Sequence, residues 1–269
     1  MTDEKDNYQS NDSSEVTPLS RKLPAGRGVG AEVDINCDMG EGVGNDEAIM
    51  PFISSANIAC GYHAGDVKTI WQTIELAIKY KVYIGAHPSF HDKKNFGRKE
   101  INLSPEEVYE LVTQQLLLFN EIAVSADVSM HHIKPHGALY NMSVKDVSIA
   151  RAIARAVKDF DQKLVLFGLS GSHSISEAKA VGLKTAREAF ADRSYRDDGS
   201  LTPRTQPGAL IGDTGKVVQQ VLQMIKQGTV TTVSGKIIPI VAETICIHGD
   251  GDHAVEFAKA IHDALQKKK

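Results

Sequence analysis

Acidic, histidine and lysine side chains stand at the ends of five apolar runs in this chain. The runs are VDINCDMGEG from residue 33, ANIACGYHAGD from 56, VYIGAHPSF from 82, MHHIKPHGALYN from 130 and TICIHGDGD from 244. Parallel α/β proteins build active sites from side chains at the carboxyl ends of their strands. Because the feature recurs, we expect these side chains to converge on one face of the protein.

The residue types at the first three strand ends predict acid–base chemistry. Asp38 is a candidate general base, metal ligand or partner that orients His63, and Glu41 follows it on the same loop. Histidine titrates near neutral pH, so His63 and His87 are candidates for proton transfer. The alternative for each residue is a structural role, as a capping group or a satisfied buried polar group.

Later polar residues suit substrate binding. In IKPHGALYN, Lys134 ends a strand and can pair with a carboxylate or a phosphoryl group. His136 is a further acid–base candidate, and Asn141 is a candidate positioning group. Arg193 and Arg204 lie in the loop-like stretch FADRSYRDDGSLTPR, and arginine suits fork-like recognition of carboxylates and phosphates. For the three cations the alternative is a local salt bridge.

The HGDGD tract that begins at His248 is open to three interpretations. It precedes the last helical pattern, and late barrel loops that lead into a helix often bind phosphate. Its two acidic residues count against a bare anion site. A cation site and a simple helix cap are the alternatives.

Short apolar runs alternate with helical periodicity from residue 31 onward, which predicts parallel βα units. Helix starts are readable at Asp66, at Asp213 and at Ser104, where Glu107 completes a capping box. Gly228 is placed to end the helix that Asp213 opens. Seven strands are expected, at residues 33–37, 56–60, 82–86, 130–134, 164–169, 184–190 and 243–247. The sixth is the least distinct, because KTAREAF also fits a helix.

Seven such units predict an α/β fold, a single domain with a distorted seven-stranded β/α barrel at residues 31–269. An open doubly wound sheet is the alternative, and both arrangements bring the polar strand ends together. Residues 1–30 are rich in Ser, Asp and Gly and nearly free of periodic apolar residues. They cannot repay the entropy of ordering, so we expect a disordered N-terminal tail.

Composition disfavours several classes of function. The 30 basic and 34 acidic residues give a net charge of −4, which argues against binding to nucleic acid. No stretch approaches the roughly 20 apolar residues of a membrane span, and the N-terminus lacks an apolar signal core. Cys37, Cys60 and Cys246 each lie in an apolar run and are expected to be buried and reduced. We therefore expect a cytoplasmic protein.

Several of these segments resemble the LamB/YcsF family, which includes the A subunit of bacterial-type 5-oxoprolinase. They are DINCDMGEG, ANIACGYHAGD, GAHPSF with FGR, IKPHGALYN, FADRSYRDDGSL with PGALI, and ICIHGD, in the family's order across residues 34–250. The resemblance implies a distorted β/α barrel related to sugar deacetylases. It also implies ATP-dependent hydrolysis of the lactam 5-oxoproline (pyroglutamate) to glutamate, with two partner subunits of B and C type. Ser89-Phe90 and Lys99 depart from the family, where Gly-Tyr and Arg are common.

Opening a five-membered lactam requires an activated carbonyl, a water nucleophile, a base and charge stabilisation. ATP as co-substrate can supply the activation by phosphorylating the lactam oxygen. The chain carries no G-x-x-x-x-G-K-[ST] sequence, so we expect partner subunits to handle ATP wholly or in part. By likeness to the deacetylases, a divalent metal is a further expectation, with Asp38, His63 and His87 as its ligands.

The resemblance thus divides the candidate residues by role. The catalytic candidates are Asp38, His63, His87, Lys134 and His136. The substrate-binding candidates are Glu41, Asn141, Arg193 and Arg204. Two other functions are kept as alternatives. One is a stand-alone metal-dependent deacetylase or amidohydrolase acting on a sugar-like substrate, and the other is a non-catalytic binding or scaffold subunit.

Overall fold

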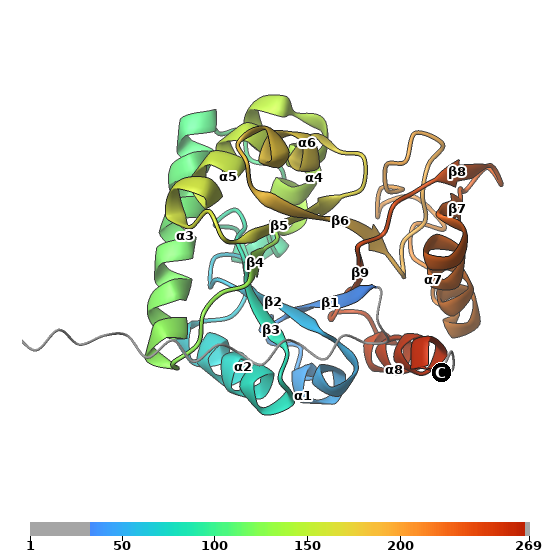
Figure 1. Cartoon of the computed structure of the whole chain (residues 1–269), viewed down its shortest axis with the longest axis horizontal. Helices are drawn as coiled ribbons and strands as arrows, with labels where there is room; N and C mark the ends of the chain where they lie inside the picture. The colour runs from blue at the N-terminus through green and yellow to red at the C-terminus, as the bar shows by residue number, and fades with distance from the viewer. Residues whose placement is uncertain (1–32, 267–269) are drawn as a thin grey trace, which may run out of the picture.

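Seven parallel strands close into a barrel in the order β1-β2-β3-β4-β5-β6-β9 (Figure 1). Their bounds are β1 (Asp34–Met39), β2 (Ser55–Ala59), β3 (Tyr83–His87), β4 (His132–Ile133), β5 (Val165–Leu169), β6 (Lys184–Phe190) and β9 (Thr244–Ile247). The last strand closes the barrel, because Thr244 of β9 pairs with both Asp34 of β1 and Glu188 of β6. The predicted seven-stranded β/α barrel is confirmed, and an open sheet is excluded.

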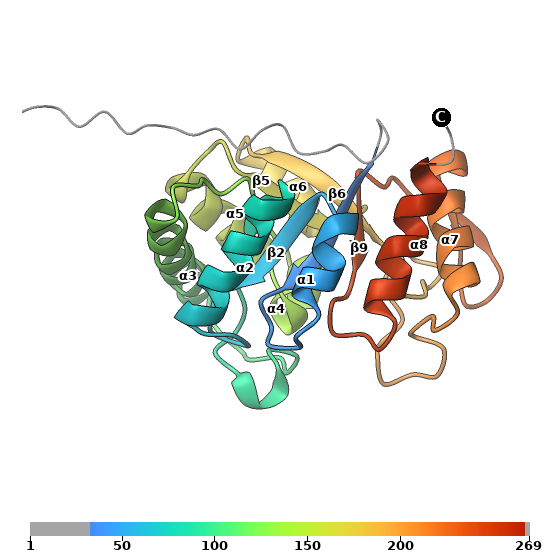
Figure 2. The same ribbon diagram turned by 90° about the horizontal axis from the view of Figure 1, so that it is seen from below.

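The structure is a computed structural model that describes residues 33–266, so the predicted tail at residues 1–30 lies outside the described residues. Helices surround the barrel (Figures 1 and 2). They are α1 (Asp46–Ile49), α2 (Val67–Tyr80), α3 (Pro105–Ser125), α4 (Gly137–Lys145), α5 (Val147–Phe160), α6 (His173–Ala180), α7 (Thr214–Gln227) and α8 (Ala254–Gln266), with 3₁₀ turns η2 (Met50–Phe52) and η3 (Lys93–Asn95). Among residues 33–266, no helix combines the length and the apolar character needed to cross a membrane.

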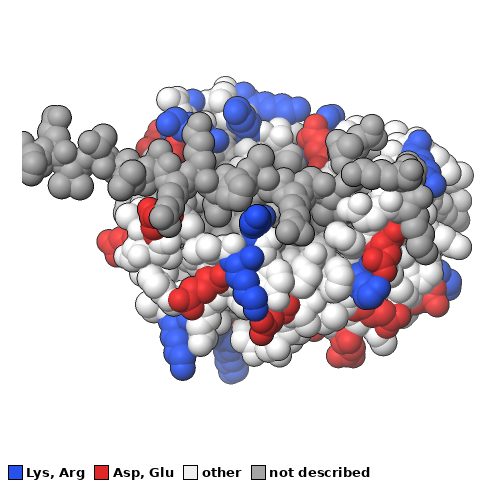
Figure 3. All heavy atoms as spheres, turned by 60° about the horizontal axis from the view of Figure 1, so that its bottom comes forward, with Lys and Arg blue, Asp and Glu red and all other residues white. Residues whose placement is uncertain are grey.

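The barrel is distorted between β6 and β9. This connection carries α7 and a small antiparallel hairpin of β7 (Thr229–Thr231) and β8 (Ile237–Pro239), which was not predicted. In Figure 2, α7 runs beside α8, outside β9. On the face shown in Figure 3, acidic and basic side chains are interspersed, which agrees with the small net charge of −4.

Local signals predict the helix ends correctly. The Asp66 carboxylate accepts a hydrogen bond from the Thr69 amide at 2.8 Å. Ser104 and Glu107 form both halves of the capping box, at 3.2 and 2.7 Å. These contacts satisfy amides that the first turn of a helix leaves without partners. The helix opened by Asp213 ends at Gly228, which has a left-handed φ of 63°.

The interior of the barrel is polar, whereas the layer between strands and helices is apolar. Along β1, Ile35, Cys37 and Met39 belong to the hydrophobic core. The alternate residue Asn36 instead donates to Glu188 of β6 at 3.0 Å and to Thr244 of β9 at 2.6 Å. Successive strand side chains point to opposite faces, so the two sets separate cleanly. The interior therefore holds a hydrogen-bonded network below the carboxyl ends of the strands.

Candidate active site

A cavity of about 740 Å³ opens at the carboxyl ends of the barrel strands. The predicted residues that line it are Asp38, His87, Lys134, His136, Asn141, Arg193 and Arg204. Glu41 and His63 lie just behind its wall, where the His63 ring stacks on that of His136 with 3.9 Å between centroids. The expected convergence of the strand ends on one face is confirmed.

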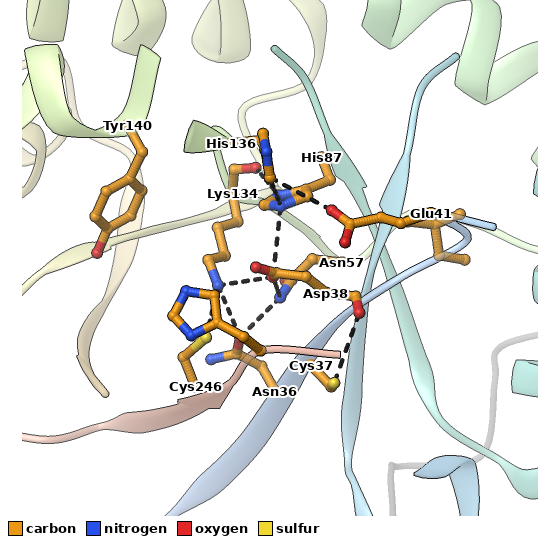
Figure 4. A network of polar contacts seen from close by, with 12 residues as sticks. Asn36, Cys37, Asp38, Glu41, Asn57, His87, Lys134, His136, Tyr140 and Cys246 are labelled. Carbon is orange, nitrogen blue, oxygen red and sulfur yellow. Dashed lines mark hydrogen bonds and ion pairs between the residues drawn. The ribbon is translucent and has the colours of Figure 1, made fainter. Parts of the chain in front are cut away.

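Lys134 is the centre of the buried polar network (Figure 4). Its ammonium nitrogen lies 2.8 Å from Asp38 Oδ1 and 3.0 Å from Glu188 Oε1. It also donates to Asn36 Oδ1 at 3.2 Å and to Cys246 Sγ at 3.0 Å. Burial by itself lowers the pKa of Lys134, but the negative charge around it dominates and holds that pKa well above its usual value. Lys134 is therefore a fixed positive charge, and it cannot serve as a base near neutral pH.

Asp38 is the corresponding fixed negative charge at the base of the cavity. Its Oδ1 accepts from the Asn57 amide at 2.9 Å and lies 3.4 Å from His87 Nε2. Burial alone raises the pKa of Asp38, but His87 and Lys134 outweigh burial and hold it well below the usual range. The carboxylate therefore remains ionised at neutral pH.

One ring nitrogen of His87 faces one ring nitrogen of His136. In each ring the other nitrogen donates to a backbone carbonyl, so the facing nitrogen is left as an acceptor. His87 Nδ1 lies 2.6 Å from the Lys134 carbonyl, and His136 Nε2 lies 3.0 Å from the Phe96 carbonyl. Because a carbonyl only accepts, both outer nitrogens carry the proton of the neutral ring. The inner nitrogens, His87 Nε2 and His136 Nδ1, are 2.9 Å apart. Two lone pairs at this distance require a shared proton or a cation beside them.

Glu41 completes a cluster with the histidines. Its Oε1 lies 3.1 Å from His63 Nε2 and 3.5 Å from His136 Nδ1. Burial, and then Asp38, raise the pKa of Glu41 well above its usual value. Burial and the charge of His87 lower the pKa of His63 to about 3. His63 Nδ1 is buried without a hydrogen-bond partner among the described residues, which indicates a water or an ion beside the cluster.

The cluster fits a divalent cation. Glu41, His63, His87 and His136 each offer one donor atom, and these atoms all lie within 4.8 Å of one another. Three imidazoles and a carboxylate suit Zn²⁺ and similar ions. The carbonyls that hold the outer N–H groups of His87 and His136 are the partners that metal-binding histidines usually have.

The predicted ligand set and this cluster share His63 and His87 only. Asp38 was expected beside His63 and His87, but the residues that share the cluster with these two are Glu41 and His136. Asp38 projects from β1 into the barrel toward Lys134 and groups instead with Cys246 and His248. Glu41 reaches the histidines from the loop that follows β1.

Arg193 is largely committed to the backbone of its own loop. Its Nη2 donates to the Thr202 carbonyl at 2.6 Å, and its Nε donates to the Ala209 carbonyl at 3.3 Å. Burial, and then Arg204, lower the pKa of Arg193 to about 10. Arg204 and Asn141 are exposed at the cavity lining. A substrate-binding role for Arg193, Arg204 and Asn141 stays a prediction.

The HGDGD tract packs directly on the site. A Cβ atom on Gly249 would lie 2.2 Å from the Asp38 carbonyl oxygen, so only glycine fits there. His248 lines the cavity, and its Nδ1 lies 2.9 Å from Asp192 Oδ1. Asp250 pairs with Arg98 from the loop after β3. The tract therefore positions groups at the cavity, and its interpretation as a phosphate or cation site stays untested.

Sequence reasoning missed the side chains that hold the predicted residues. Glu188 accepts from the Tyr140 hydroxyl at 2.7 Å, and both residues are buried. Asn57 links the network to His132, whose Nε2 lies 2.9 Å from Asn57 Oδ1. The signal for Asn57 was available, because a period of two in β2 marks polar side chains that point into the barrel.

Comparisons with known proteins identify the family of this chain. The LamB/YcsF family model matches residues 33–269. A relative from Bordetella pertussis, named as the A subunit of 5-oxoprolinase, is 48% identical over 240 residues, covering 87% of this chain and 95% of the relative. The chain belongs to the LamB/YcsF family. The predicted family resemblance is thereby confirmed.

Two further LamB/YcsF comparisons extend the match. A protein from Oceanobacillus iheyensis, also named as the A subunit of 5-oxoprolinase, is 50% identical over 242 residues, covering 88% of this chain and 94% of that one. The crystal structure of a lactam utilization protein from Thermus thermophilus superposes with a TM-score of 0.82 at 41% identity. That alignment covers 88% of this chain and 96% of the other, so the barrel and its mouth belong to the family fold.

Proposed function

We propose that this LamB/YcsF protein is the A subunit of a 5-oxoprolinase. It hydrolyses the lactam ring of 5-oxoproline to glutamate, together with partner subunits of B and C type and with ATP as co-substrate. The observation that carries the proposal is the ionised Asp38 at the base of the cavity, held between Lys134 and His87. The names of relatives about half identical to this chain support the same activity.

The charges at the base of the cavity suit addition of water to the lactam carbonyl. Asp38 accepts a proton from the attacking water, directly or through His87 Nε2 at 3.4 Å. The three N–H groups of the Lys134 ammonium already donate to buried partners. Lys134 therefore stabilises the developing oxyanion through its charge and not through a hydrogen bond. When the carbon–nitrogen bond breaks, the ring nitrogen takes up the proton lost by water and becomes the amine of glutamate.

His136 is placed to supply a proton to the ring nitrogen when the carbon–nitrogen bond breaks. Burial, followed by the charges of His63 and His87, keeps the pKa of His136 well below its usual value, so the ring is neutral at neutral pH. Its Nδ1 faces His87 Nε2 at 2.9 Å, and a proton can pass between the two nitrogens. The pair can therefore give its shared proton to the leaving amine and regain one from the proton that Asp38 takes from water.

Glu41, His63, His87 and His136 would hold a divalent metal. Such an ion, when bound, lowers the pKa of water and polarises a carbonyl. With the ion bound, His87 Nε2 and His136 Nδ1 would be ligands together with Glu41 and His63, so Asp38 alone would accept the proton of water. We assign ATP to the partner subunits, because the sequence has no phosphate-binding G-x-x-x-x-G-K-[ST] loop.

Reconstitution tests this function. The purified chain alone is expected to release little glutamate from 5-oxoproline, and release should appear when both partner types and ATP are added. Rapid ATP-independent opening of the lactam by the isolated chain would contradict the assignment of ATP to the partners. No release by the complete assembly would contradict the function itself.

A stand-alone metal-dependent deacetylase is the second candidate, favoured only by the histidine–glutamate cluster. The isolated chain would then remove acetyl groups from an acetylated sugar without ATP, and a chelator would abolish this activity. Activity that appears only with 5-oxoproline, ATP and partners would exclude this candidate.

A further inference from the structure

Arg98 is a cavity-lining cation whose partner lies near the surface. Its Nη2 atom pairs with Asp250 Oδ2 at 2.5 Å, and the two side chains are 35% and 20% exposed. Arg98 follows β3, whereas Asp250 follows β9, so the ion pair joins two loops that β1 and β2 separate at the barrel rim. An ion pair this exposed contributes little net stability, and another anion can replace the Asp250 carboxylate.

The buried cations of the cavity are already committed to other partners. Lys134 is 2% exposed and contacts two carboxylates. Arg193 is 6% exposed and donates to two backbone carbonyls. Neither group can turn toward an incoming anion without leaving a buried partner unpaired, which is costly. Arg98 can do so at the cost of one surface ion pair.

The backbone below Arg98 is anchored to the proposed catalytic groups. The Gly97 carbonyl accepts from the Ala138 amide at 2.9 Å, at the start of α4. A Cβ atom on Gly97 would lie 2.8 Å from the Cβ of His63, so the loop is in close contact with the cluster. The guanidinium of Arg98 lies over the Phe96 ring at 4.8 Å, and the Phe96 carbonyl holds His136. The Phe96 ring therefore supports the guanidinium at the edge of the cavity.

We propose that Arg98 binds the carboxylate of the lactam substrate and that Asp250 is the internal counter-ion which this carboxylate replaces. The inference rests on the proposed function, because 5-oxoproline carries a carboxylate beside its ring nitrogen and glutamate retains it. A guanidinium binds a carboxylate through two parallel hydrogen bonds, which fixes orientation as well as charge. The exchange replaces one carboxylate by another, so Arg98 keeps a negatively charged partner throughout.

The test measures binding of 5-oxoproline to the full-length chain by calorimetry, with 2-pyrrolidinone, the same lactam without the carboxylate, as a matched ligand. Arg98→Gln should weaken 5-oxoproline binding by about 10- to 100-fold and leave 2-pyrrolidinone binding unchanged. Asp250→Asn should strengthen 5-oxoproline binding several-fold, a gain that misfolding cannot produce. Lys145→Gln removes another cavity-lining cation and should have a much smaller effect.

Three results would overturn the inference: unchanged 5-oxoproline binding in Arg98→Gln, equal losses for both lactams, or an equal loss in Lys145→Gln. Absence of 5-oxoproline binding to the wild-type chain would also overturn it if the complete assembly releases glutamate. Glutamate release by the wild-type assembly is measured in parallel. If release occurs and the Arg98 result fails, the inference alone is wrong; if release is absent, the proposed function fails.

Discussion

Lys134 Nζ lies 2.8 Å from Asp38 Oδ1, and the two side chains are only 2% and 6% exposed. The residues come from β1 and the end of β4, which are not neighbours in the barrel. A buried ion pair costs solvation, so it stabilises the fold only weakly relative to apolar residues. The ion pair instead fixes the positions of both charges beneath the cavity before a ligand binds.

Removing the cation should destabilise the fold. Lys134→Met leaves Asp38 and Glu188 as buried carboxylates without their counter-ion, and we expect a loss of about 3–5 kcal/mol in the free energy of unfolding. Urea denaturation measures this loss. Lys79→Met is the control, because Lys79 and Glu47 are 58% and 64% exposed, and we expect a change below about 1 kcal/mol. Equal losses in the two variants would contradict the account.

Gly85→Ala should destabilise the barrel by overpacking. The new methyl carbon would lie 2.3 Å from the His132 ring, which is stacked on Phe167 with 4.2 Å between centroids. We expect a loss of at least about 1–3 kcal/mol in urea denaturation, partly relieved when His132→Ala is added. Gly212→Ala is the control, since a Cβ atom at that position would have no neighbouring atom within 4 Å. An unchanged free energy of unfolding in Gly85→Ala would contradict this prediction and show that β3 can move away from the His132 ring.

The stability difference between wild type and Asp192→Asn should depend on pH. Burial raises the pKa of Asp192, but His248, Arg204 and Arg193 outweigh burial and hold that pKa below its usual value. A lowered folded-state pKa adds stability above the unfolded-state value of about 3.9, and this is lost as pH falls through the folded-state pKa.

We therefore expect Asp192→Asn to cost about 1–3 kcal/mol at pH 7, with the difference shrinking below about pH 4. Urea denaturation between pH 7 and pH 3 measures it. Glu75→Gln changes an exposed acid on α2 and should show a small difference throughout. A difference that grows as pH falls would have the wrong sign for this account.

Metal binding should depend on the cluster of Glu41, His63, His87 and His136. Calorimetric titration with Zn²⁺ should show about one ion per chain. His136→Ala should weaken binding by at least about 10-fold, whereas the exposed control His173→Ala should not. Zn²⁺ affinity unchanged in His136→Ala would remove the cluster as a metal site.

The elements with local signals could be predicted from the sequence. The capping box of Ser104 and Glu107 lies within four residues, and the barrel strands other than β6 lie in apolar runs. The hairpin of β7 and β8 was missed because each strand has three residues, too few to show a period. Glu188 was missed because KTAREAF fits a helix as well as a strand.

The partners within the site could not be predicted, since they depend on closure of the barrel. Asp38 and Lys134 are 96 residues apart in the chain, and only the three-dimensional arrangement brings their atoms together. Glu41, and not the predicted Asp38, lies in the histidine cluster. Its position depends on the loop after β1, where Gly40 has a φ of 69°. Strand ends identify candidate residues, whereas loop geometry decides which of them meet.

The most direct test of the central claim compares wild type with Asp38→Asn in the complete assembly with B- and C-type partners, 5-oxoproline and ATP. Glutamate release is the quantity measured, and Glu106→Gln, an exposed change on α3, is the control. We predict that Asp38→Asn lowers release by at least about 100-fold while the control matches wild type. Full glutamate release by the Asp38→Asn assembly would contradict the assignment of the hydrolytic step to this chain.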